Sequence, residues 1–156
     1  MRKLALGKES SLSLSVLAVI PDEADRDALR GLFRRSNWFV SFTCSIAETM
    51  RSLKESPMPV VLCDRDLPDG SWKDLLAAVQ TLRRPPRVVV TSRLVDERLW
   101  VEALNLGCHD VLPQPIHGSE LFPVLSFAWR SWPHERGDSG DDCERLAHAQ
   151  VCGAAT

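Results

Sequence analysis

Short apolar runs in this sequence end in polar residues that can bind a ligand. The three runs and the residues that follow them are Val60-Val61-Leu62-Cys63 with Asp64, Val88-Val89-Val90 with Thr91, and Val111-Leu112 with Pro113-Gln114-Pro115. If these runs are strands of one open parallel sheet, their carboxyl ends lie at the edge where such sheets bind ligands. A carboxylate, a hydroxyl and an X-Pro pair at one edge therefore form a candidate site.

The apolar spacing also predicts the elements that would position these groups. Short buried runs predict five strands, at 14–20, 38–43, 60–63, 88–90 and 111–112. Helical spacing and capping residues predict five helices, at 23–35, 45–55, 71–82, 96–106 and 119–132. Strands that alternate with helices predict an α/β fold, a doubly wound five-stranded parallel sheet with helices on both faces.

Length and composition set the domain organisation. The 156 residues suffice for one domain, and 44% of them are hydrophobic, which excludes a wholly disordered chain. We predict an N-terminal extension at 1–13, a domain at 14–132 and a disordered acidic tail at 133–156. The tail has five acidic residues against two basic ones. Its 24 residues are too few for an output domain, which predicts a stand-alone protein.

Charge and cysteine content exclude several classes of function. Nineteen basic residues against 21 acidic ones argue against nucleic-acid binding, and no apolar run approaches the roughly 18 residues that span a membrane. The five cysteines form no C-x-x-C pair, which favours a reduced, cytoplasmic protein.

At this point the sequence resembles the receiver domain of two-component response regulators. The segments that carry the resemblance are 60–70, 86–91 and 103–115, with Asp64 before a Leu-Pro-x-Gly turn and a Gly-x-x-Asp-x-Leu-x-x-Pro run from Gly107. The resemblance covers residues 14–132 and implies the flavodoxin-like receiver fold. It implies that Asp64 accepts a phosphoryl group from a histidine kinase and that the hydroxyl of Thr91, or of Ser92 after a one-residue shift, senses it. It also implies a cis bond between Gln114 and Pro115.

Four positions depart from the pattern of that family. The acidic pair that holds Mg²⁺ falls on Ile20 and Pro21, the phosphoryl-binding lysine on Gln114, and the switching aromatic residue on Val111. Ile20 and Pro21 offer no carboxylate, and Gln114 offers no charge. A one-residue slip leaves a weakened metal site as an alternative, built from Asp22, Asp64 and Asp66.

These departures predict a degenerate receiver-like domain that acts as a protein-interaction module in phosphorelay signalling and is not an enzyme. We expect no cofactor. Mg²⁺ is expected to bind only if the site is functional. The expected partner is a histidine kinase, another signalling protein or a second copy, bound through about 96–132, which holds Trp100, Trp129 and Trp132.

Three other interpretations stay open. The first is a working phosphoacceptor receiver that a histidine kinase phosphorylates on Asp64. The second is a nucleotide-binding protein or small enzyme on a flavodoxin-like fold, although neither G-x-G-x-x-G nor G-x-x-x-x-G-K-[ST] follows the first strand. In the third, Asp64 is a structural carboxylate that caps a turn.

Overall fold

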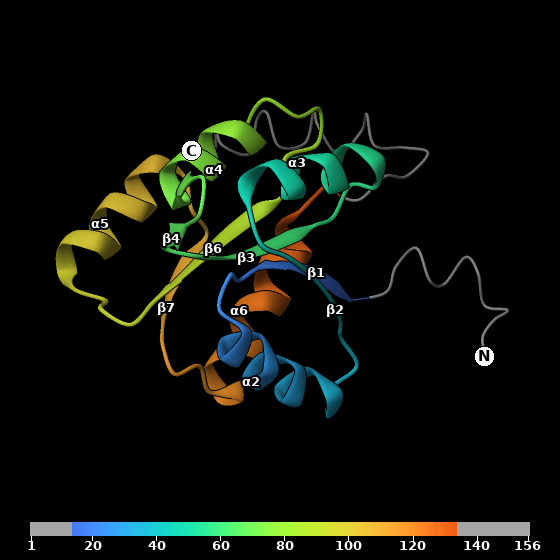
Figure 1. The fold of residues 1–156 in the computed structure, drawn as a ribbon, viewed down its shortest axis with the longest axis vertical. Helices are drawn as coiled ribbons and strands as arrows, with labels where there is room; N and C mark the ends of the chain where they lie inside the picture. The colour runs from blue at the N-terminus through green and yellow to red at the C-terminus, as the bar shows by residue number, and fades with distance from the viewer. Residues whose placement is uncertain (1–13, 134–156) are drawn as a thin grey trace, which may run out of the picture.

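The computed structural model describes residues 14–133. The predicted extension at 1–13 and the predicted tail beyond Pro133 lie outside the described residues. Five parallel strands form the central sheet, in the order β2-β1-β3-β6-β7 (Figure 1). Their bounds are Ser15–Val19 for β1, Phe39–Thr43 for β2, Val60–Asp64 for β3, Arg87–Ser92 for β6 and Asp110–Pro113 for β7. The predicted doubly wound fold is confirmed.

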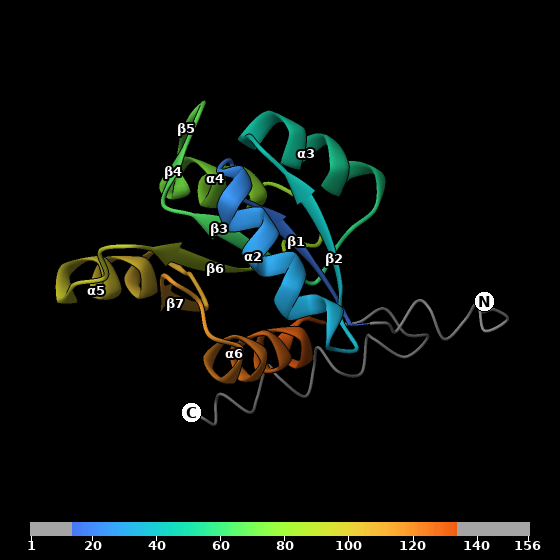
Figure 2. The ribbon, with the colours of Figure 1, turned by 60° about the horizontal axis from the view of Figure 1, so that its bottom comes forward.

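Helices cover both faces of this sheet (Figures 1 and 2). Their bounds are Glu23–Arg34 for α2, Ile46–Glu55 for α3, Trp72–Val79 for α4, Glu97–Leu106 for α5 and Gly118–Ser131 for α6. One hydrophobic cluster joins the sheet to α3, α4 and α5, and a second joins it to α2 and α6. Successive strand residues alternate between these clusters: Leu62 packs on the α2 and α6 side, and Cys63 on the other. None of the described helices is long and apolar enough to span a membrane.

Side-chain caps start the helices near the predicted residues. The side chains of Asp22, Ser45, Ser71 and Asp96 each accept a hydrogen bond from a backbone N–H in the first turn of the helix that follows. Gly107, with φ 110°, ends α5 in the left-handed conformation. These caps place the helix starts within a residue or two of the predicted ones.

The region after β3 differs from the prediction. The predicted turn at Leu67–Gly70 is flanked by two short antiparallel strands, β4 (Asp66–Leu67) and β5 (Gly70–Ser71). Asp69 at the tip accepts hydrogen bonds from the N–H groups of Ile46 and Ala47, which holds the hairpin against the start of α3. These backbone bonds lower the pKa of the Asp69 carboxyl. The helix that follows ends at Val79, three residues before the predicted end at Leu82.

The C-terminal end of α6 is fixed to the loop before β6. The indole Nε1 of Trp132 donates a hydrogen bond to the Pro85 carbonyl at 3.0 Å, and the Arg84 guanidinium lies 4.2 Å from the centre of the Trp132 ring. Arg87, the first residue of β6, donates to the carbonyl of Ser131 at 2.6 Å. Trp132 is thus a buried packing residue, which removes it from the predicted docking surface.

Candidate functional site

Asp64 and Thr91 lie side by side at the carboxyl ends of the two central strands. They are register partners between β3 and β6. Leu62 and Val89, two residues earlier in each strand, pack in the cluster with α2 and α6. Because side chains alternate along a strand, Asp64 and Thr91 both project toward α2 and α6. The strand-end reasoning therefore brings these two predicted residues together.

The carboxylate of Asp64 is half-buried and accepts a hydrogen bond from the N–H of Arg65 at 2.9 Å. Burial raises the pKa of the Asp64 carboxyl above its usual value, and the Arg65 N–H opposes this. Negative charge on Asp25 and Asp66 raises the same pKa further, whereas positive charge on Arg93 lowers it. Asp64 thus has two acidic neighbours and a cationic one.

Thr91 carries an unpartnered hydroxyl. Its side chain is fully buried, and its Oγ1 has no hydrogen-bond partner among residues 14–133. Ser92, the predicted alternative, uses its hydroxyl locally: Oγ donates to the Leu94 carbonyl and accepts from the Leu94 N–H, both at 3.1 Å. A buried hydroxyl without a partner is uncommon, because desolvation is then uncompensated. Of the two residues, it is Thr91 that leaves a group open for a ligand.

The end of β1 is apolar and is covered by a guanidinium. Ile20 is fully buried in the cluster with α2 and α6. Arg26 Nη1 donates hydrogen bonds to the carbonyls of Ile20 at 2.7 Å and of Pro21 at 2.9 Å, and lies 3.4 Å from the Cys44 sulfur. The two positions where the resemblance implies an acidic pair therefore hold a core isoleucine and a proline, and the Arg26 guanidinium binds the carbonyls of both.

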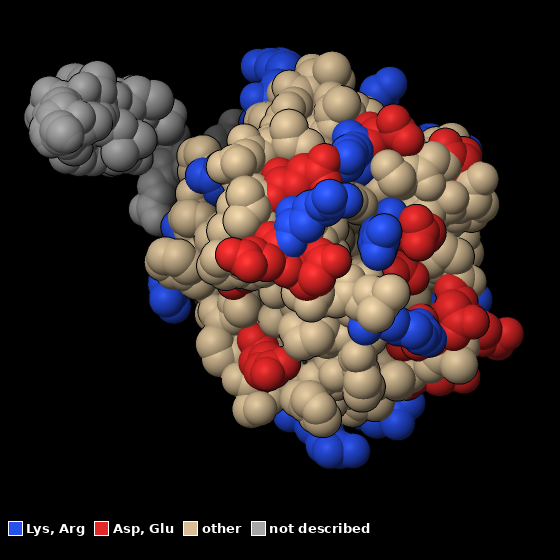
Figure 3. Space-filling view, turned by 90° about the vertical axis from the view of Figure 1, so that its left-hand side faces the viewer, with Lys and Arg blue, Asp and Glu red and all other residues tan. Residues whose placement is uncertain are grey.

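A second arginine bridges the elements on either side of the site. Arg93 Nη2 lies 3.1 Å from Asp25 Oδ1 and 3.3 Å from Oδ2, and Nη1 donates to Gln114 Oε1 at 3.0 Å. Asp25 belongs to the first turn of α2, Arg93 follows β6, and Gln114 follows β7. Figure 3 faces this end of the sheet and shows acidic and basic side chains interspersed on its surface.

Three residues at this end of the sheet are not predicted from the sequence: Arg93, Asp25 and Arg26. Arg93 lies two residues beyond Thr91, so the strand-end reasoning extended by two residues would have included it. Asp25 gives a weaker signal, because acidic residues are ordinary in the first turn of a helix.

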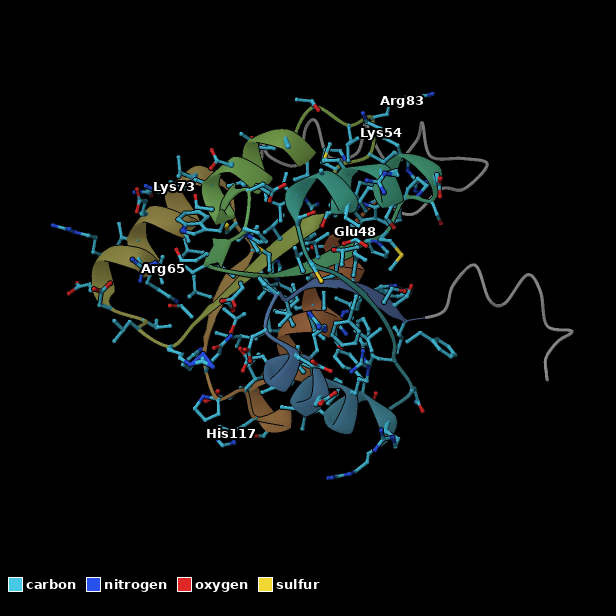
Figure 4. All side chains as sticks on the ribbon, in the orientation of Figure 1. Glu48, Lys54, Arg65, Lys73, Arg83 and His117 are labelled. Carbon is cyan, nitrogen blue, oxygen red and sulfur yellow. The ribbon has the colours of Figure 1, made fainter. Side chains whose placement is uncertain are left out.

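Arg65, like Arg93, is an arginine at the carboxyl ends of the central strands, but it lies on the other face of the sheet. It is exposed and adjacent to Asp64, but it lines a cavity with residues of α4 and α5, on the other face of the sheet. Figure 4 shows it on that side, as it does Lys73 of α4.

The residues present do not fit the magnesium site that the family implies. Asp22 is the N-cap of α2, where its Oδ2 accepts the N–H of Asp25 at 3.0 Å. Asp66 is exposed in β4. Within residues 14–133, no group of three or more His, Cys, Asp or Glu side chains is placed to hold a metal ion. The structure thus does not assemble Asp22, Asp64 and Asp66 into the alternative metal site.

The two remaining predicted positions lie in β7 and just beyond it. Val111 is buried in the cluster with α3, α4 and α5, so it is a packing residue. The bond between Gln114 and Pro115 is cis, as predicted. The side-chain amide oxygen of Gln114 accepts a hydrogen bond from Arg93.

The outer surface of α5 and α6 exposes apolar side chains. On α5, Trp100 is 46% exposed, and Val101 and Leu104 are exposed beside it in the helical sequence. On α6, Phe127 is 59% exposed and its ring contacts that of His109, with 5.2 Å between the centroids. Of the three tryptophans predicted to lie on this surface, Trp100 is the exposed one, Trp132 is buried and Trp129 is partly buried.

Comparison with known proteins agrees with this geometry. The family model described as response regulator receiver domain matches residues 16–126. The chain is 31% identical over 108 residues to the transcriptional regulatory protein CutR of Streptomyces coelicolor, covering 69% of this chain and 50% of CutR. It is 30% identical over 118 residues to KdpE of Mycobacterium tuberculosis, covering 75% of this chain and 52% of KdpE.

Solved structures share the fold. A response regulator receiver domain protein from Clostridium thermocellum superposes with a TM-score of 0.68 at 18% identity, covering 75% of this chain and 94% of that one. The beryllofluoride-activated NtrC4 receiver domain dimer gives 0.69 at 19% identity, covering 76% and 98%. The chain spans about half the length of the curated relatives CutR and KdpE. On the family match and the geometry of the strand ends, the chain belongs to the response regulator receiver domain family.

Proposed function

We propose that this receiver domain is degenerate and acts in two-component signalling as a non-enzymatic protein-interaction module. Its state would then not depend on magnesium-assisted phosphorylation of Asp64. The proposal depends chiefly on the structure at the end of β1. There Ile20 is buried in the core, and Arg26 donates hydrogen bonds to the carbonyls of Ile20 and Pro21. Without a divalent cation, a carboxylate and a phosphoryl donor repel each other through their negative charges.

The interaction surface that we propose is the edge of the sheet at β7, which α5 and α6 flank from opposite faces of the sheet. Trp100, Val101, Leu104 and Phe127 expose apolar area there. Exposed apolar patches can mark interaction sites, and tryptophan is enriched where binding energy concentrates. The solved NtrC4 structure is described as a receiver domain dimer, and for this chain we propose self-association.

A second candidate function is phosphorylation of Asp64, which two observations favour. The Thr91 hydroxyl, which has no hydrogen-bond partner within the described residues 14–133, lies on the same face of the sheet as Asp64. Arg93 carries a positive charge near Asp64, which Gln114 cannot supply. A guanidinium binds phosphoryl oxygens well, so Arg93 offers a replacement for the missing lysine.

Intact-mass measurement separates the two functions. The wild type and Asp64→Asn are incubated with acetyl phosphate and Mg²⁺, beside an active receiver domain as positive control. We expect no added phosphoryl group on either protein. A phosphoryl group on the wild type that is absent from Asp64→Asn would establish the second function and contradict the first.

Sedimentation velocity over a range of concentrations tests the surface. We expect the wild type and Asp64→Asn to associate equally, and Trp100→Ala to associate more weakly because it loses an exposed aromatic anchor. Loss of association in Asp64→Asn but not in Trp100→Ala would favour phosphoryl-dependent signalling. A wild type that is monomeric at every concentration would rule out self-association.

A further inference from the structure

A groove near the amino ends of β3 and β6 combines basic and apolar side chains. It has a volume of about 530 Å³ and lies between the end of α3 and the loop that leads from α4 to β6. Its apolar and basic lining residues are Leu53, Pro57 and Leu82, and Lys54, Arg83 and Arg84. Leu53 is buried, whereas Lys54 and Arg83 are exposed and lie together at this end of the molecule (Figure 4). We call this site the basic groove.

The positive charge of the basic groove is not balanced within residues 14–133. No acidic side chain lines it there, and Lys54 and Arg83 form no ion pair or side-chain hydrogen bond with another residue of that range. Lys54 lies in the last turn of α3, where a cation is ordinary. Like charges from two elements that line one groove nevertheless repel each other. The basic groove therefore favours an anionic occupant.

A second groove, between the hairpin of β4 and β5 and the helices α4 and α5, has balanced charges. Its basic and acidic lining residues are Arg65, Lys73 and Arg98, and Asp66, Asp96 and Glu102. Lys73 and Glu102 form an ion pair across it. The excess of positive charge is thus a property of the basic groove and not of every groove on this surface.

The chain reaches Pro133 at the rim of the basic groove. Arg84 Nη2 donates a hydrogen bond to the Pro133 carbonyl at 3.1 Å. The next part of the sequence, residues 135–144, includes five acidic side chains and one basic one. Asp138 is five positions beyond Pro133, so at about 3.6 Å per residue it can lie up to about 18 Å from it. These acidic residues are therefore tethered within reach of the basic groove.

We propose that the basic groove binds residues 135–144 of the same chain through their carboxylates. Attachment at Pro133 gives these acids a local concentration in the millimolar range, so that individually weak ion pairs suffice. While the segment is bound, it closes the groove to an acidic partner. The proposal is independent of the proposed function, because it involves neither Asp64 nor the edge of the sheet at β7.

A nitroxide on Cys143, inside the acidic segment, tests this contact in the full chain. Cys44 is exposed, so it and Cys152 are replaced by serine, while Cys63 and Cys108 are buried and stay. In ¹⁵N-labelled protein, we expect the nitroxide to cause a loss of the amide signals at 53–57 and 81–84.

Reversal of the groove charge is the deciding comparison, because the tether alone keeps Cys143 near the domain. We expect Lys54→Glu/Arg83→Glu to restore most of the lost signal, since attraction becomes repulsion. Salt at about 1 M, which shortens the Debye length to about 3 Å, should also restore it. If this variant unfolds, Lys54→Gln/Arg83→Gln removes the charge at the same exposed positions and serves in its place.

Two further variants locate the effect. Arg65→Glu/Lys73→Glu makes the same change of charge in the second groove, and we expect it to leave the signal loss unchanged. Asp141→Lys/Asp142→Lys, combined with the reversed basic groove, should bring the signal loss back because attraction returns with opposite signs.

Equal signal loss with the original and the reversed basic groove would overturn the proposal, as would a loss that Arg65→Glu/Lys73→Glu also abolishes. A mixture of ¹⁵N-labelled protein without nitroxide and unlabelled protein with nitroxide tests a second copy as the occupant. Signal loss of the same size in that mixture would overturn the contact within one chain. Each of these outcomes leaves the proposed function untouched, because none depends on Asp64 or Trp100.

Discussion

The two central strands and the two flanking strands end very differently in this domain. β3 and β6 end with Asp64 and Thr91 as register partners on one face of the sheet. β1 and β7, on either side, end with Ile20 in the core and with the neutral Gln114 beyond the last strand. A carboxylate and a hydroxyl thus lie at the ends of the central strands, whereas an apolar residue and a neutral amide lie at the ends of the flanking ones.

Two arginines outside the strands supply positive charge at this end of the sheet. Arg26, on α2, donates hydrogen bonds to the carbonyls at the end of β1. Arg93, after β6, donates a hydrogen bond to the side-chain oxygen of Gln114. Both are fixed by hydrogen bonds within the chain. The flanks of this sheet end are therefore held together by contacts within the protein itself.

The largest effect on stability is expected at the end of β1, where Ile20 is part of the core. Ile20→Asp should lower the free energy of unfolding by about 4 kcal/mol, because it removes a fully buried side chain and buries a charge without a partner. Urea unfolding measures this value. Pro21→Asp, at the less buried neighbouring position, should cost about 1 kcal/mol. A cost of about 1 kcal/mol or less for Ile20→Asp would show that the end of β1 tolerates an acidic residue at this position.

A smaller effect is expected from the arginine that covers the same strand end. Arg26→Ala should lower the free energy of unfolding by about 2 kcal/mol, because two carbonyls lose a charged donor. Arg34→Ala, an exposed arginine at the other end of α2, is the control and should change the value by less than about 0.5 kcal/mol. If both variants unfold alike, the contact of Arg26 with the strand end contributes nothing.

At the end of the central strand β3, a substitution of Asp64 is expected to change how the free energy of unfolding depends on pH. Burial raises the pKa of Asp64 in the folded protein, so the folded state binds this proton more tightly than the unfolded chain. Its contribution therefore lowers the free energy of unfolding as the pH rises above about 4. Asp64→Asn should be more stable than the wild type at pH 7, and the difference should shrink toward pH 4.

Urea unfolding at several pH values checks this expectation. Asp66→Asn is the matched control, since Asp66 is exposed two residues away. A wild type that is more stable than Asp64→Asn at pH 7 would mean that hydrogen bonding to the carboxylate outweighs its burial.

The smallest effect is expected at the end of β7. Gln114→Lys adds a positive charge that faces Arg93 and should lower the free energy of unfolding by about 0.5 kcal/mol. Gln114→Glu should raise it by a similar amount, and added salt should reduce both changes. Insensitivity of both variants to salt would exclude a charge effect at this position.

The elements were predictable because each depends on local sequence. Buried runs such as Val60–Asp64 and caps such as Ser45 fixed strands and helices to within a few residues. The hairpin of β4 and β5 was missed because its strands have two residues each, too short for any periodicity.

The site was predictable only in part, for a related reason. Asp64, Thr91 and Gln114 follow from the ends of strands. The contact of Arg93 with Asp25 joins residues 68 positions apart, and it depends on side-chain reach between elements rather than on any motif.

The attachment of α6 decides how any change at Asp64 would be transmitted along the chain. Trp132 and Ser131 are bound to Pro85 and Arg87, at the residues that lead into β6. Residue 133 therefore leaves the domain at the amino ends of the strands, whereas Asp64 and Thr91 lie at the carboxyl ends. A segment attached to residue 133 would therefore start at the opposite end of β6 from Asp64 and Thr91.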